Sequence, residues 1–266
     1  EFENARDGGL TDLGSSGHSR HGARVHYDTI ENSGNGAFGD PTDATAEKGE
    51  RIFEAACDEL IQLGEWLATL EDADLTIAHD AMFGAAQGLV EALLGDGVVS
   101  LRHDLNPGFH GTAPEPIADR LTELSDTVAQ GDAKVGLAND GDGDRIGMVD
   151  EEGTFVSSHR ILALLVKYLY EERGLTGSIV KTFSTTHLLD KMGARYGLEV
   201  ETTPIGFKHI APKMAEGSVL VGGEESGGIA AAGHIPERDG VYIGLLLVEM
   251  MVERGMLLSE LVDELL

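Results

Sequence analysis

The chain has 266 residues and 41% of them are hydrophobic, so it is long enough for two ordinary domains with apolar cores of their own. Its 47 acidic residues against 19 basic ones give a formal net charge of −28, which repels nucleic acid and anionic membranes and excludes both as expected partners. The single cysteine, Cys57, excludes disulfides within the chain, and no apolar run approaches the roughly 20 residues of a membrane-spanning helix, so we expect a cytoplasmic protein without a signal peptide.

The composition of residues 1–50 predicts an irregular segment. They are rich in Gly, Ser, Asp and His and show little apolar periodicity. His18, His21 and His26 lie close together in the sequence, but a metal cluster would need a cysteine or a firmly spaced fourth ligand beside them. We therefore interpret them as surface or disordered histidines.

A helical pattern begins at residue 46 and is followed by alternating strands and helices. Residues 46–70 carry apolar side chains at spacings of three and four, as one buried face of a helix requires. The next expected elements are a strand at 75–78, a loop at 79–84, a helix ending at 94, a strand at 98–101, a helix at 117–128, and strands at 135–138 and 146–149. Such alternation predicts a parallel sheet covered by helices, with ligands at the carboxyl ends of its strands.

A second unit with the same alternation of strands and helices begins near residue 157. We expect Ser157 or Ser158 and Thr185 or Thr186 to cap its first two helices. The expected elements are a helix at 161–170, a strand at 179–182, a helix ending at 192, a strand at 198–202, a helix ending at 214, a strand at 219–221, a helix from 240 to 254 and a last helix at 258–265.

These patterns predict the fold class α/β, with two consecutive α/β domains that have mixed, mostly parallel sheets. The first domain is expected at residues 51–156 and the second at residues 157–266.

The stretch Asp140-Gly-Asp142-Gly-Asp144-Arg145 predicts a metal-binding loop at the end of the strand expected at 135–138. The glycines between the carboxylates have no Cβ, so the backbone can fold back and bring the carboxylates around one cation. An all-oxygen ligand set that leaves room for water and phosphate suits Mg²⁺ better than Zn²⁺. Arg145 adds a guanidinium that can grip a phosphate.

The same loop has two other interpretations. A solvated acidic turn is one, although three aspartates alternating with glycine are more than a turn requires. A calcium-binding EF-hand is the other, because Asp140, Asp142, Asp144 and Glu151 fall at ligand positions of that motif. The EF-hand needs glycine at its sixth position, where this chain has Arg145, and it needs helices where this chain predicts strands.

Three motifs occur in order: the loop at 140–145, the turn Gly206-Phe207-Lys208, and the loop Gly-Gly-Glu-Glu-Ser-Gly-Gly at 222–228. Together they resemble the α-D-phosphohexomutase family, the phosphoglucomutases and phosphomannomutases, over residues 70–266. The resemblance implies domains two and three of a four-domain enzyme, with residues 1–50 as a remnant of the first domain.

The resemblance also implies an activity. The family moves a phosphoryl group between O1 and O6 of a hexose through a bisphosphorylated intermediate, using a phosphoserine and Mg²⁺. In these terms Asp140, Asp142 and Asp144 hold the Mg²⁺, and Arg145 supports the phosphate.

For the other motifs the resemblance implies contacts with the sugar. Glu224 and Ser226 would bind sugar hydroxyls, and Lys208 would lie near the reacting sugar or phosphate. An ordinary acidic turn and a surface lysine are the simpler alternatives. Arg238 and Asp239 are expected to pair with each other near a helix start.

The sequence also departs from the family. The phosphoserine motif Thr-x-Ser-His-Asn-Pro and the phosphate-binding motif Arg-x-Ser-Gly-Thr-Glu do not occur in it, and Ser16-Gly-His18 lacks the Asn-Pro that shapes the first of them. We therefore expect the chain to act on a hexose phosphate only together with missing domains of the same polypeptide. Glucose phosphate is the expected substrate; mannose or glucosamine phosphate, or a non-catalytic module that binds a divalent cation and a sugar phosphate, are the alternatives.

The acidic excess predicts a halophilic protein, because high ionic strength screens the repulsion among the 47 acidic residues. The melting temperature, followed by circular dichroism, is expected to rise from low salt to molar KCl. A melting temperature that stays flat over this range would contradict the prediction.

Overall fold

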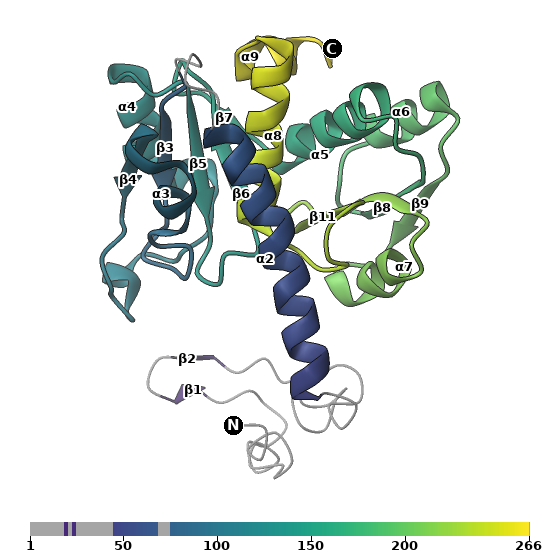
Figure 1. The fold of residues 1–266 in the computed structure, drawn as a ribbon, viewed down its shortest axis with the longest axis horizontal. Helices are drawn as coiled ribbons and strands as arrows, with labels where there is room; N and C mark the ends of the chain where they lie inside the picture. The colour runs from purple at the N-terminus through teal and green to yellow at the C-terminus, as the bar shows by residue number, and fades with distance from the viewer. Residues whose placement is uncertain (1–18, 21–22, 25–44, 69–74, 266) are drawn as a thin grey trace. The chain divides into compact units, whose positions relative to one another are not determined.

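The computed structural model describes residues 19–20, 23–24, 45–68 and 75–265, and Figure 1 shows the fold. The chain divides into two compact units, Glu1–Glu54 and Ala55–Leu266. In the first unit the strands β1, Ser19–Arg20, and β2, Ala23–Arg24, pair antiparallel. The predicted surface histidines His18, His21 and His26 lie outside the described residues. Helix α2, Ala46–Ala68, confirms the helix predicted from residue 46.

The first sheet of the second unit has the strand order β4-β3-β5-β6-β7. Its strands are β3 (Ile77–Asp80), β4 (Val98–Leu101), β5 (Val135–Asn139), β6 (Ile146–Val149) and β7 (Phe155–Val156). β3 is parallel to β4 and β5, whereas β6 is antiparallel to both of its neighbours, so the sheet is mixed. Its helices are α3 (Leu89–Leu94) and α4 (Thr122–Gln130), and α4 packs Leu124 and Val128 against Ala78 and Ala138.

The second sheet has the strand order β11-β10-β8-β9. Its strands are β8 (Ser178–Thr182), β9 (Val200–Thr203), β10 (Val219–Gly223) and β11 (Ile229–Ala231). β8 is parallel to β9 and β10, and β11 is antiparallel to β10. The helices α5 (Ser158–Lys167), α6 (Leu188–Tyr196) and α7 (Ala211–Ala215) complete this layer structure. The predicted class, α/β with mixed and mostly parallel sheets, is confirmed.

Helix α8, Gly240–Arg254, connects the two sheets. Its residues 240–251 are all buried, as expected of a helix that is apolar on every side. It contacts β5 and β6 of the first sheet and β11 of the second, and Figure 1 shows it in yellow beside β6 and α5. One apolar core runs from the first sheet through α5 and α8 to the second sheet and the last helix, α9, Leu258–Asp263.

The strand β3 is longer than predicted. His79 and Asp80, which we expected in a loop, are its last two residues and are buried. Polar residues are tolerated here because each has a polar partner: His79 contacts Asn139, and Asp80 accepts hydrogen bonds from Arg102. The end of an apolar run therefore did not mark the end of the strand.

Helix starts also differ from the prediction. The helix expected at 117–128 is interrupted at Leu121, between the 3-10 turn Ala118–Arg120 and α4. Ser157 is the N-cap residue of α5, but its side chain caps no backbone N–H. The hydroxyl of Thr186 does accept a hydrogen bond from the backbone of Leu188, the first residue of α6. Among the described helices, none combines the length and apolar content that crossing a bilayer requires.

Candidate active site

The three aspartates of the predicted metal loop converge. Strand β5 ends at Asn139, the loop follows at once, and carboxylate oxygens of Asp140, Asp142 and Asp144 all lie within 4.8 Å of one another. Gly143 has φ +82°, a left-handed conformation that an L side chain rarely adopts, and this residue turns the chain between Asp142 and Asp144. The predicted convergence of the carboxylates is therefore present in the structure.

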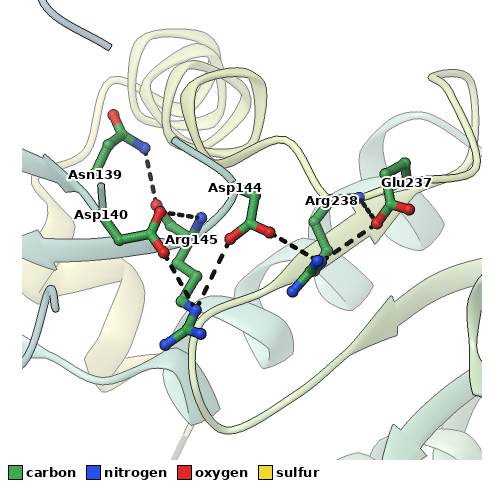
Figure 2. A network of polar contacts seen from close by, with 6 residues as sticks. All are labelled: Asn139, Asp140, Asp144, Arg145, Glu237 and Arg238. Atoms are coloured by element: carbon green, nitrogen blue, oxygen red, sulfur yellow. Dashed lines mark hydrogen bonds and ion pairs between the residues drawn. The ribbon is translucent and has the colours of Figure 1, made fainter. Parts of the chain in front are cut away.

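Both backbone groups of Arg145 close the loop. Its N–H donates to Oδ1 of Asp140 at 3.0 Å, and its carbonyl accepts from Nδ2 of Asn139 at 2.9 Å. Arg145 also begins the return of the chain into β6. The loop is thus held at both ends by hydrogen bonds across its neck, as Figure 2 shows.

Two guanidinium groups compensate the carboxylates. Nε of Arg145 lies 3.2 Å from Oδ2 of Asp140 and 3.8 Å from Oδ1 of Asp144. Nη2 of Arg238 lies 2.8 Å from Oδ2 of Asp144, and Figure 2 shows both arginines reaching toward this one carboxylate. The expected pairing of Arg238 with Asp239 is wrong, because Asp239 accepts a hydrogen bond from the backbone of Tyr242 and caps α8 instead.

Burial affects the protonation of two of the aspartates. Asp140 is only 5% exposed, and burial, with contributions from the neighbouring carboxylates, raises its pKa to about 6. Burial likewise raises the pKa of Asp144, and Oδ1 of this residue is buried without a hydrogen-bond partner. An orphaned carboxylate oxygen beside two further oxygen donors fits a hard divalent cation.

The second predicted loop lies at the end of β10. Glu224 is buried, and its Oε1 accepts a hydrogen bond from the backbone N–H of Gly206 at 2.8 Å. Gly206 precedes the short turn Phe207–His209, so the carboxylate ties the predicted sugar loop to the turn that carries Lys208. The Lys208 side chain is exposed on that turn, and Ser226 is half-buried.

Glu225 is a residue of this loop to which the sequence assigned no role. Its Oε2 accepts hydrogen bonds from Thr182 at 3.1 Å and from Ser184, and its carbonyl accepts from Ser158 at 2.5 Å. Burial acts to raise the pKa of Glu225, but hydrogen bonds to its carboxylate from Ser184, from its own backbone and from Thr182 outweigh burial and hold the pKa below its ordinary value. Its partners lie on other elements, so no local pattern pointed to them.

The two loops meet through their backbones. The N–H of Ile146 donates to the carbonyl of Gly227 at 3.1 Å, and Arg145 forms an isolated antiparallel bridge with Gly228. Arg238 adds a side-chain link, because its guanidinium carbon lies 5.2 Å from the ring centroid of Phe207, next to Lys208. The aspartate loop, Arg145 and the loop of Glu224 and Ser226 therefore lie side by side.

Two family models match this region. Residues 57–153 match the phosphoglucomutase/phosphomannomutase alpha/beta/alpha domain II, and residues 157–266 match domain III of the same family. The chain belongs to the phosphoglucomutase/phosphomannomutase family. The resemblance predicted from the three motifs is confirmed.

Relatives within the phosphoglucomutase/phosphomannomutase family carry several names. The phosphoglucosamine mutase of Halalkalibacterium halodurans is 32% identical over 237 residues, which cover 84% of this chain and 50% of the relative. The phosphoglucomutase/phosphomannomutase of Thermococcus kodakarensis is 34% identical over 172 residues, which cover 65% of this chain and 38% of the relative. The chain thus spans half or less of the length of these relatives.

Solved structures of the phosphoglucomutase/phosphomannomutase family have the same fold. The family protein from Burkholderia thailandensis matches with a TM-score of 0.67 and 25% identity, over 78% of this chain and 46% of that protein. Parafusin, a phosphoglucomutase from Paramecium in its open form, matches with a TM-score of 0.67 and 26% identity, over 83% of this chain and 41% of that protein.

A third family model matches a different part of the chain. Residues 3–63 match creatinine amidohydrolase, and this match overlaps the domain II match within α2. The expectation that residues 1–50 are a remnant of the first phosphohexomutase domain stays a prediction, and this similarity points to another family.

Gly240 lies close to the Arg145 carbonyl and to Asn139, so a substitution at Gly240 tests the closure of the loop. A Cβ at Gly240 would fall inside van der Waals contact of the Arg145 carbonyl oxygen and 2.6 Å from Nδ2 of Asn139. Gly240→Ala is therefore expected to lower the free energy of unfolding by about 1–3 kcal/mol, although alanine has a higher helix propensity than glycine. Urea unfolding followed by circular dichroism measures this.

The matched control is Gly49→Ala, also within a helix, where nothing lies within 4 Å of the added Cβ. This variant is expected to leave the free energy of unfolding unchanged or slightly higher. Equal stability of Gly240→Ala and Gly49→Ala would show that the Arg145 carbonyl can move aside.

Proposed function

We propose that the chain is the central part of a phosphohexomutase that needs Mg²⁺ and interconverts the 1-phosphate and 6-phosphate of a hexose, with glucose phosphate as its substrate. The observation that carries the proposal is the aspartate loop, closed directly against the loop of Glu224 and Ser226. The phosphoserine and the bisphosphate intermediate that the family resemblance implies would involve the missing domains of the same polypeptide.

Phosphoryl transfer depends on positioning and on charge neutralisation rather than on covalent chemistry by many side chains. Mg²⁺ held by Asp140, Asp142 and Asp144 would supply the neutralising charge for the phosphoryl group. Arg145 contacts the same carboxylates through Nε, and the rest of its planar guanidinium can donate to phosphate oxygens.

The hexose would be oriented from the second domain. Glu224 and Ser226 offer a carboxylate and a hydroxyl on a glycine-flanked loop, which suits two neighbouring sugar hydroxyls. Lys208 supplies a cation from the turn that Glu224 fixes through Gly206. Arg238, anchored on Asp144, brings a second guanidinium to the same site, and we propose that it assists in phosphate binding.

A non-catalytic module that binds a divalent cation and a sugar phosphate is a second candidate function. It is supported by the aspartate cluster and the adjoining loop of Glu224 and Ser226, which can bind a cation and a sugar phosphate without a nucleophile. Mannose phosphate and glucosamine phosphate are alternative substrates, because relatives are named phosphomannomutase and phosphoglucosamine mutase. We further propose a cytoplasmic location, domains at 51–156 and 157–266, and no nucleic acid or membrane partner.

The metal site is tested by a matched pair of variants. Asp142 and Asp96 are both exposed aspartates with glycine on either side, but only Asp142 belongs to the converging carboxylates. Asp142→Asn is expected to weaken Mg²⁺ binding at least about tenfold in isothermal titration calorimetry, because it replaces an anionic oxygen ligand by a neutral one. Asp96→Asn is expected to leave it unchanged. An equal loss in both variants would mean that Mg²⁺ is only a counterion of the acidic surface.

Turnover separates the two candidate functions. The chain alone is expected not to interconvert glucose 1-phosphate and glucose 6-phosphate, whereas its full-length parent is expected to do so and to carry one phosphate in its intact mass that a phosphatase removes. Robust turnover by the isolated chain would overturn the dependence on other domains. A full-length parent with neither phosphate nor turnover would favour the binding module.

A further inference from the structure

A chain of buried polar contacts leads from β3 to the metal loop. His79, on β3, is 1% exposed, and its Nε2 lies 3.1 Å from Oδ1 of Asn139. Asn139, also 1% exposed, is the last residue of β5 and directly precedes Asp140. Its Nδ2 in turn donates to the carbonyl of Arg145 at 2.9 Å. The imidazole is therefore connected through Asn139 to the hydrogen bond that closes the loop.

The direction of these hydrogen bonds follows from donor chemistry. A carbonyl oxygen only accepts, so the amide nitrogen of Asn139 must face Arg145 and its Oδ1 must face His79. An acceptor oxygen requires an N–H, and Nε2 of His79 is the atom within reach. The other ring nitrogen, Nδ1, is 3.9 Å from Oε2 of Glu91, which is too far for a hydrogen bond.

The Asn139 amide is closely packed in the orientation that holds the Arg145 carbonyl. Gly240 at the start of α8 approaches so closely that an added Cβ would lie 2.6 Å from Nδ2 of Asn139. If Oδ1 lost its donor, the amide would bury an acceptor without a partner, and a rotation to find one would release the Arg145 carbonyl. Such a rotation would open the neck of the loop that holds the three carboxylates together.

We propose that His79 is a positioning residue for the metal loop, acting through Asn139. Its Nε2–H fixes the amide, and the amide fixes the Arg145 carbonyl in the position that closes the loop. His79 does not contact the carboxylates or the substrate in this role. The inference rests on the proposed Mg²⁺ site and extends it to a residue on a neighbouring strand.

The test compares two replacements of His79 by Mg²⁺ titration of the 266-residue chain. His79→Leu removes the donor and is expected to raise the Mg²⁺ dissociation constant about tenfold, the usual effect of losing a group that orients a metal ligand. His79→Gln retains an N–H donor at a similar reach and is expected to keep the constant within about twofold of the original chain.

Tyr168→Phe is the control for a purely structural effect. Tyr168 is fully buried, and its hydroxyl donates to Glu253 at 2.9 Å. This variant is expected to lower the melting temperature but to leave the Mg²⁺ dissociation constant unchanged. His79→Leu with an unchanged constant, or His79→Gln as weak as His79→Leu, would overturn the proposal.

A measurement on the unaltered chain covers the case in which His79→Leu does not fold. In histidine labelled with ¹⁵N, the Nε2-protonated ring of His79 and a shift of its resonance on Mg²⁺ addition are expected; a neutral ring protonated only at Nδ1 would overturn the proposal. An unaltered chain that binds no Mg²⁺ overturns both this inference and the proposed function. Binding that Asp142→Asn weakens, but that His79→Leu does not, overturns this inference alone.

Discussion

Repulsion among three carboxylates within 4.8 Å of one another is the constraint on which the site depends. It is opposed from both domains: Arg145 comes from the loop itself, and Arg238 comes from the residues before α8. Two guanidinium groups therefore face one aspartate cluster in a chain that has only 19 basic residues against 47 acidic ones. Oδ1 of Asp144 is buried without a hydrogen-bond partner, 3.8 Å from Nε of Arg145, and a buried oxygen of this kind suits a cation.

Hydrogen bonds also fix the backbone of the aspartate loop. Both the N–H and the carbonyl of Arg145 are hydrogen-bonded to residues at the loop start, and the N–H of Gly240 donates to the carbonyl of Gly143 at 3.0 Å. The loop thus receives contacts from β5 and from the first residue of α8. A preorganised ligand set of this kind limits the reorganisation that binding a cation would require.

Local patterns predicted the parts of the site that depend on neighbouring residues. The spacing of Asp140, Asp142 and Asp144 after an apolar strand gave both their convergence and their position at a sheet edge. Arg238 could not be found this way, because its partner Asp144 is distant in sequence and nothing around Arg238 marks the contact. His79 was predicted in a loop because a polar residue ended an apolar run, whereas the partner that allows its burial lies on another strand.

The apolar cluster that the two sheets share has a consequence for how the polypeptide can be divided. Side chains of α5 and α8 fill the space beside both sheets, so a cut between residues 156 and 157 would strip each half of part of its interior. The two family models divide the chain between residues 153 and 157, whereas Ala55–Leu266 forms one compact unit. Recombination that exchanged one half would therefore have to preserve the complementary surface of α8 as well as the motifs of the site.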